Sequence, residues 1–319
     1  MRSACSRPCA GAPRRGLQAG FSLIEFLVAS VIGALLLLTG AVMLFSASSA
    51  YTAQADGAAI DEGGRLALDI VSRAVRQAAY VEQERGTAVD AANSALQIIG
   101  RDAMAVPRAT HGIDGATAEA VNGSDVLALR FAGAHGGAVD CAGFALEPGE
   151  DGWSIFHVGR NAAGEGELRC KYRGAGGWGS DAIIDGVDTF QVLYGLDTDE
   201  PADGVPNEFV SAAVIEARDA ALLLAGADEA ARQRDLWRRS AWKRVTAVRI
   251  ALLLHGPGKG APREPVVYDV FGTAYSARFA AADAGVQIAE APMSAALRLR
   301  ERRLFSSTIV LRNAAGSTQ

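Results

Sequence analysis

The sequence predicts an α+β protein in which one long N-terminal helix packs on an antiparallel β-sheet head. Three observations support this class: an apolar N-terminal segment, a one-sided helical pattern that continues it, and a later series of short strand-like segments separated by Gly-rich turns. With 319 residues, of which 50% are hydrophobic and 21% charged, the chain is long enough to bury a sizeable core.

The apolar segment covers residues 21–45 and reads FSLIEFLVASVIGALLLLTGAVMLF. As a helix it would extend roughly 37 Å, enough to cross a bilayer with some tilt. It is longer than the apolar region of a secretory signal peptide, which has roughly 7–15 residues. The residues before it include arginines and no acid, which predicts that they stay in the cytoplasm and that the remainder faces the periplasm or exterior. These arginines are Arg2, Arg7, Arg14 and Arg15.

Glu25 is the one charged residue of this segment. A carboxylate inside an apolar span costs about 3 kcal/mol on insertion scales, so it needs either a partner or a function. The simpler alternative is an acid that snorkels to the membrane surface from the start of the helix, but a glutamate side chain is short for that purpose.

The stretch GFSLIE, from Gly20 to Glu25, resembles the processing motif of type IV prepilins and type II secretion pseudopilins. The resemblance implies that a membrane peptidase cuts between Gly20 and Phe21, methylates the new N-terminus, and thereby removes a leader of residues 1–20. It also implies a role in assembly for Glu25. A free amine on Phe21 of one subunit would supply the cation that Glu25 of a neighbour needs in an apolar setting.

The helix is predicted to continue beyond the membrane to about residue 82, because apolar and small residues recur with a period near 3.6. They are Ile60, Ala67, Ile70, Val71, Ala74, Val75 and Ala78. Glycines at 57, 63 and 64 each cost about 1 kcal/mol in a helix, which predicts a flexible or melted joint there. The predicted organisation is a leader (1–20), a transmembrane helix (21–45), the periplasmic half of the same helix (46–85) and a β-rich head (86–319).

Within the head, the pattern of alternating and β-branched residues predicts strands separated by turn signals. The segments are 126–131, 155–158, 168–172, 187–194, 245–254, 266–271 and a final strand at 302–313, with a helical interruption at about 213–239. Cys141 and Cys170 lie in this exported part and could form one disulfide, whereas Cys5 and Cys9 belong to the leader.

Several head segments resemble the minor pilins called PilW: GSDVLALRF, GVDTFQVLYGLDTD, VTAVRIALLL and RLFSSTIVLRN, together with the CAG at 141–143 and the later lone cysteine. The resemblance implies a structural subunit that takes part in initiating type IV pilus assembly at or near the fibre tip. It would sit in the inner membrane with a periplasmic head and then in the fibre. The implied partners are other minor pilins, the major pilin, a tip adhesin, the prepilin peptidase and the inner-membrane assembly platform.

Two other functions fit the processing motif. One is a minor pseudopilin of type II secretion, of the GspJ type; the other is a surface-binding pilin, for example one that captures DNA in competence. DNA capture calls for a basic stripe with aromatic residues, and only residues 237–244 approach it. The net charge of −5 supplies no general field for nucleic acid, so we expect those residues to be a helix end with solvated arginines.

The sequence predicts no enzyme, no catalytic residue and no cofactor. The segment GAGGWG (174–179) matches GxGxxG, but a strand-like rather than a helical segment follows, so we interpret it as a loop. The four histidines do not have metal-ligand spacing. An acidic loop with Asp197, Asp199 and Asp203 is a candidate calcium site, although its spacing departs from that of an EF-hand. The default interpretation is a solvated acidic turn that matters little to folding.

Overall fold

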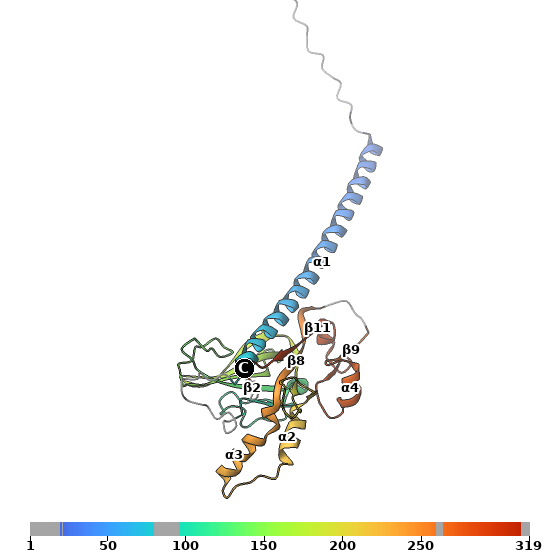
Figure 1. Cartoon of the computed structure of the whole chain (residues 1–319). Coiled ribbons are helices and arrows are strands. Elements are labelled where there is room, and N and C mark those ends of the chain that lie inside the picture. The colour runs from blue at the N-terminus through green and yellow to red at the C-terminus, as the bar shows by residue number, and fades with distance from the viewer. Residues whose placement is uncertain (1–19, 21, 80–95, 260–263, 314–319) are drawn as a thin grey trace, which may run out of the picture. The chain divides into compact units, whose positions relative to one another are not determined.

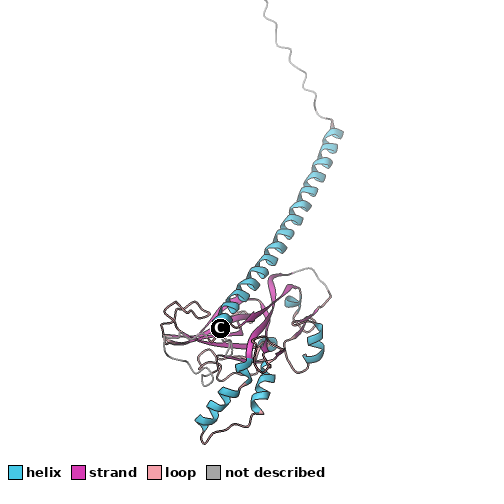
Figure 2. Cartoon of the chain, in the orientation of Figure 1, coloured by secondary structure: helices cyan, strands magenta, loops and turns pink. Residues whose placement is uncertain are grey.

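The computed structural model describes residues 20, 22–79, 96–259 and 264–313 (Figure 1). The chain divides into two compact units, Met1–Thr52 and Ala53–Gln319. Figure 2 shows that helix dominates the described part of the first unit, whereas the second combines the C-terminal part of the same long helix with strands and short helices.

Helix α1 runs from Leu23 to Gln77 without interruption. Its N-terminal part is apolar and exposed, with a mean hydropathy of 2.5 over the most apolar window, and among the described residues α1 is long and apolar enough to cross a membrane. The helix ends earlier than predicted, since Ala79 adopts a φ of 60°, which breaks the helical path. Phe21 and residues 80–95 lie outside the described residues.

The predicted joint at residues 57–64 is wrong. Strand β11 (Arg300–Val310) passes close to the helix there, and a Cβ atom on Gly64 would lie 2.5 Å from the ring of Phe305. A Cβ on Gly57 would similarly lie 2.9 Å from the guanidinium of Arg303. The glycines therefore allow close packing, which offsets their low helix propensity.

Two antiparallel sheets build the head. The five-stranded sheet has the order β1-β2-β3-β4-β5, and the four-stranded sheet has the order β11-β8-β6-β7. The strands of the first sheet are β1 (Ile98–Arg101), β2 (Val126–Ala132), β3 (Asp151–Arg160), β4 (Gly166–Gly174) and β5 (Gly177–Asp185). The remaining strands of the second are β6 (Val187–Leu196), β7 (Glu208–Val210) and β8 (Val245–Lys259).

Two excursions leave the four-stranded sheet. The first carries helices α2 (Ala212–Ala220) and α3 (Glu229–Arg239), followed by the short 3-10 helix η2 (Ala241–Arg244). The second carries a two-stranded sheet of β9 (Val267–Asp269) and β10 (Gln287–Ala289) with helices α4 (Thr273–Phe279) and α5 (Ala295–Arg298). A further 3-10 turn, η1 (Val121–Gly123), precedes β2. The predicted helical interruption is thus two helices, and the predicted strand at 266–271 is shorter.

The core lies between the C-terminal part of α1 and both sheets. The helix contributes Ala67, Val71 and Val75, which are fully buried as the periodic pattern predicted. Alternation along β2 places Leu127 and Leu129 in this core, while Val126 and Ala128 join a smaller cluster with Trp153 and Ile155. The predicted α+β class, a long helix packed on antiparallel sheet, is confirmed.

Candidate functional site

The N-terminal end of α1 carries a reciprocal helix cap. The backbone N–H of Ser22 donates to Oε2 of Glu25 at 2.9 Å, and the N–H of Glu25 donates to Oγ of Ser22 at 3.2 Å. This is a capping box, in which two side chains satisfy N–H groups that the first helical turn leaves unpaired. Glu25 is also well placed for the positive end of the helix dipole.

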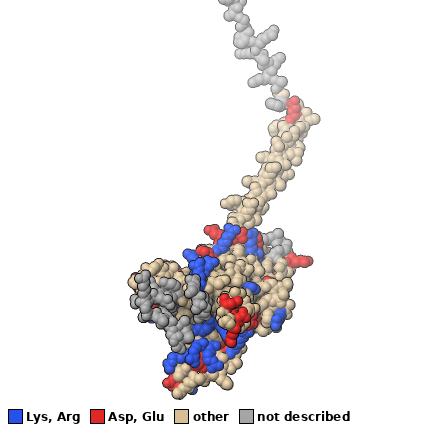
Figure 3. Space-filling view, in the orientation of Figure 1, with Lys and Arg blue, Asp and Glu red and all other residues tan. Residues whose placement is uncertain are grey.

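Sequence reasoning predicted that Glu25 needs a partner but missed this one, although the S-x-x-E spacing of Ser22 to Glu25 is a recognisable signal. The carboxylate stays exposed, and its Oε2 accepts the hydrogen bond of the cap. Figure 3 shows acidic atoms at the N-terminal end of an otherwise uncharged helical surface. Gly20 is exposed, with nothing within 4 Å of a hypothetical Cβ, whereas Phe21 lies outside the described residues.

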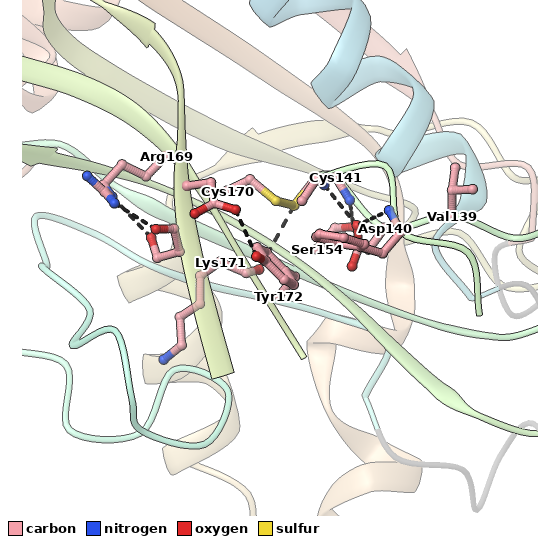
Figure 4. Close-up of a disulfide and its surroundings, with 12 residues drawn as sticks. Val139, Asp140, Cys141, Ser154, Arg169, Cys170, Lys171 and Tyr172 are labelled. Carbon is pink, nitrogen blue, oxygen red and sulfur yellow. Dashed lines mark hydrogen bonds between the residues drawn. A yellow bond between two sulfur atoms is a disulfide. The ribbon is translucent and has the colours of Figure 1, made fainter. Parts of the chain in front are cut away.

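The predicted disulfide is present in the structure. It joins Cys141, in the connection between β2 and β3, to Cys170 on β4, with a Cα–Cα distance of 5.9 Å (Figure 4). The same connection is held by further hydrogen bonds. The Cys141 N–H donates to Oγ of Ser154 at 3.0 Å, and the carboxylate of Asp140 accepts from the N–H groups of Ala142 and Phe144. Burial raises the pKa of Asp140.

Replacing both cysteines with serine should lower the free energy of unfolding by roughly 3.5 kcal/mol, because the disulfide closes a loop and so restricts the unfolded chain. The sequence separation of 29 residues sets this magnitude. Denaturant titration of the wild type and of Cys141→Ser/Cys170→Ser would measure it, with the reduced wild type as the matched control. Equal midpoints for all three samples would contradict the prediction.

The acidic loop brings Asp197, Asp199 and Asp203 together, with candidate ligand atoms within 4.8 Å of one another. Carboxylate oxygens suit calcium, but backbone N–H groups of the loop already bond two of these carboxylates, and the third, of Asp199, accepts from Nδ2 of Asn207. Asp197 is only 3% exposed and accepts from the N–H groups of Asp199 at 3.1 Å and Gly204 at 2.6 Å. Asp203 accepts from the N–H of Val205. Asp197 therefore has a structural role within the loop, and we expect it to matter more to folding than the other two aspartates.

We expect millimolar calcium to leave the melting temperature unchanged, because these hydrogen bonds account for the arrangement of the carboxylates. Asp197→Ala should instead lower the free energy of unfolding by about 1–3 kcal/mol, since it removes the acceptor of two N–H groups. Asp199→Ala, at an exposed position, is the milder control. A melting temperature that rises with calcium concentration would establish the site after all.

A buried ionic cluster joins strands β6, β8 and β11 to Glu290, the residue that follows β10. The side chain of Arg302 is 0% exposed and bonds Asp188 at 2.7 Å and Glu290 at 3.0 Å. Nδ1 of His255 lies 3.0 Å from the other oxygen of Asp188. These residues come from distant parts of the sequence, so no local pattern could have revealed the cluster. It holds the second excursion against the four-stranded sheet.

In the excursion with α2 and α3, charged side chains form hydrogen bonds and ion pairs with one another and with the backbone. The buried carboxylate of Asp235 accepts from the Ala225 N–H, Arg238 and Arg239, and these contacts lower its pKa to about 2. In the basic stretch 237–244, the ring of Trp242 is buried edge-on against Tyr194 and Arg244 pairs with Glu200. This supports the structural interpretation of that stretch over a stacking platform for nucleic acid.

Comparison with known families finds two matches. A prokaryotic N-terminal methylation motif matches residues 15–41, which include Gly20, Phe21 and Glu25. The type IV pilus-assembly protein W family, PilW, matches residues 155–313, from β3 to the end of β11. No curated protein and no solved structure matches the chain.

The apolar helix and the methylation motif fit a membrane-anchored pilin. With a methylation motif that includes the start of its apolar helix and a PilW match over much of its head, the chain is a type IV pilin of the PilW family.

Proposed function

We propose that this pilin is a structural minor pilin, not an enzyme, that takes part in initiating type IV pilus assembly at or near the fibre tip. The observation that carries the proposal is the combination in one chain of the methylation motif, the apolar helix capped by Glu25, and the PilW-family head. It would be anchored once in the inner membrane with a periplasmic head, and then enter the fibre. Its partners would be other minor pilins, the major pilin, a tip adhesin, the assembly platform and the prepilin peptidase.

The PilW match favours a pilus over a type II secretion pseudopilus, because it covers all four strands of the four-stranded sheet, β6, β7, β8 and β11. The two excursions from that sheet support a place at the end of the fibre. A subunit inside a shaft is surrounded by copies of other subunits, so additions to its head must fit against them, whereas a terminal subunit has one side free.

Deletion of the gene tests the proposal directly. We expect surface pili to be lost or strongly reduced, to return on complementation, and sibling minor pilins to be recovered with the tagged protein after mild cross-linking. Normal piliation together with defective protein secretion would instead establish the pseudopilin alternative. Normal piliation with defective DNA uptake would point to the competence alternative.

The proposal also predicts the processed N-terminus. The mature chain should begin at a methylated Phe21 and have 299 residues, which is 319 minus the 20 of the leader. Gly20→Leu should leave the precursor uncut, because the glycine lets the backbone approach the peptidase closely. Mass spectrometry of the membrane fraction would measure both forms. An N-terminus at Met1, or a cut beyond residue 40, would contradict the prediction.

A further inference from the structure

A surface groove lies between the β2–β3 connection and the β4–β5 hairpin. It has a volume of about 980 Å³ and is lined by residues of segments 140–151 and 172–179. We propose that this groove binds a neutral oligosaccharide. The inference concerns the head alone and does not depend on the position of the subunit in the fibre.

The groove has rigid walls. The Cys141–Cys170 disulfide and the Asp140 hydrogen bonds hold one wall, and the hairpin forms the other. Gly174 pairs with Gly177, whose φ of 107° suits a glycine at the tight turn. A binding site whose walls are fixed in advance loses little conformational entropy when a ligand enters.

Two aromatic rings supply an apolar platform. Phe144 is 52% exposed, and its ring centroid lies 5.0 Å from that of Tyr172. The hydroxyl of Tyr172 donates to Oδ2 of Asp181 at 2.7 Å, which fixes the orientation of this ring. A pyranose ring has a flat face of C–H groups that packs on such a platform, as aromatic side chains offer large, rigid apolar surfaces.

The polar lining supplies both kinds of hydrogen-bonding group that sugar hydroxyls need. The exposed carboxylates of Glu150 and Asp151 can accept hydrogen bonds from a ligand, and the exposed guanidinium of Arg173 can donate them. The glycine-rich hairpin also offers backbone N–H and C=O groups next to the groove. At Gly176 nothing lies within 4 Å of a hypothetical Cβ, so a ligand can approach this backbone closely. Apolar walls with a few convergent polar groups are typical of small-molecule sites.

The charge of the lining decides between ligand classes. Three carboxylates and one guanidinium disfavour an anionic ligand. A basic peptide is the competing class, but the negative charge is already partly matched. Asp151 pairs with Arg130 at 3.4 Å, Asp140 accepts from backbone N–H groups, and Arg173 would repel a cation. A neutral polyhydroxyl ligand uses donors and acceptors together without needing a charge partner.

The test uses the full-length mature protein in a detergent without a sugar headgroup, titrated by calorimetry. The neutral probes are hexasaccharides of α-linked glucose, β-linked glucose, mannose and N-acetylglucosamine, and the charged probes are an oligogalacturonate and hexalysine. We expect at least one neutral probe to bind and both charged probes to bind at least about tenfold more weakly. Absence of binding by all four neutral probes would overturn the proposal, as would a preference for hexalysine.

Two variants locate the binding. Gly176→Trp should weaken it at least about tenfold by filling the groove, and its backbone is free of the positive φ that disfavours side chains. Gly136→Trp is the matched control, since Gly136 also has open space around it but does not line the groove. Phe144→Ala should weaken binding by removing half of the platform. Equal melting temperatures would confirm that the variants fold, and unchanged affinity in Gly176→Trp would place the sugar elsewhere and overturn the proposal.

Discussion

Glu25→Ala should yield a correctly cut, stable, membrane-retained protein that restores piliation poorly in a deletion strain. Glu25 is the one charged residue between positions 21 and 55, so its carboxylate must enter an apolar environment as subunits pack. There it can pair with the Phe21 amine of an adjacent subunit. Leaving one partner of such a pair unmatched costs several kcal/mol, which shifts an assembly equilibrium by orders of magnitude. Surface pilus yield, with immunoblots for mature protein, is the measurement.

The capping box makes a sharper version of this experiment possible. Glu25→Gln keeps a side chain that can accept from the Ser22 N–H but removes the charge, whereas Ser22→Ala removes one half of the cap and keeps the charge. If the charge is what assembly needs, Glu25→Gln should fail like Glu25→Ala. Ser22→Ala should still assemble, with a helix end weaker by about 0.5–2 kcal/mol.

Other results would assign the Glu25 side chain a different role in assembly. Full piliation with Glu25→Gln but not with Glu25→Ala would mean that the helix cap, and not the charge, is required. Full piliation with Glu25→Ala at native expression would show that the carboxylate is dispensable. The proposed assembly role would then rest on the head.

Arg302→Met should lower the free energy of unfolding by about 3–5 kcal/mol, because it leaves the carboxylates of Asp188 and Glu290 buried without their cation. Both are nearly inaccessible, with side-chain exposures of 5% and 0%. For a domain of this size, such a loss lowers the melting temperature by roughly 10 °C. Thermal unfolding followed by circular dichroism at constant pH would measure it.

Two controls separate a buried charge from lost packing. Arg232→Met breaks an exposed pair with Glu229 and should change stability by less than about 1 kcal/mol. Combining Arg302→Met with Asp188→Asn and Glu290→Gln should recover part of the loss, since neutral side chains are less costly to bury than carboxylates that have lost a cation. If Arg302→Met had the same melting temperature as the wild type, the cluster would contribute nothing to stability.

Local patterns in the sequence predicted the larger elements well. The period of the helical stripe predicted which face of α1 is buried, including Ala67, Val71 and Val75, and alternation predicted β2, β3, β4, β6, β8 and β11. The short elements β1, β7, β10, α4 and α5 were missed. They have three to seven residues each, too few for a periodic signal to emerge, and their place depends on the sheet against which they form.

Contacts between distant residues explain where the local interpretation failed. Gly64 weakens a helix in isolation, but in the folded head it makes room for the ring of Phe305, far away in the sequence. The same reasoning applies to the ionic cluster, whose members Asp188, His255, Glu290 and Arg302 come from separate elements. Propensity describes one residue in its own segment, whereas packing energy depends on the partner that the fold supplies.

The sequence by itself determined the class of this protein: a prepilin-like motif at Gly20, an apolar span containing Glu25, a long amphipathic helix, and a strand-rich head with one pair of cysteines. Each of these features can be recognised from residue types and their spacing within one segment of the sequence. Only the tertiary structure decided that the helix is continuous at Gly57 and Gly64, that Arg302 is buried among carboxylates, and that Phe144 and Tyr172 meet in one groove. Each of these depends on side chains from separate segments of the sequence that only the folded chain brings together.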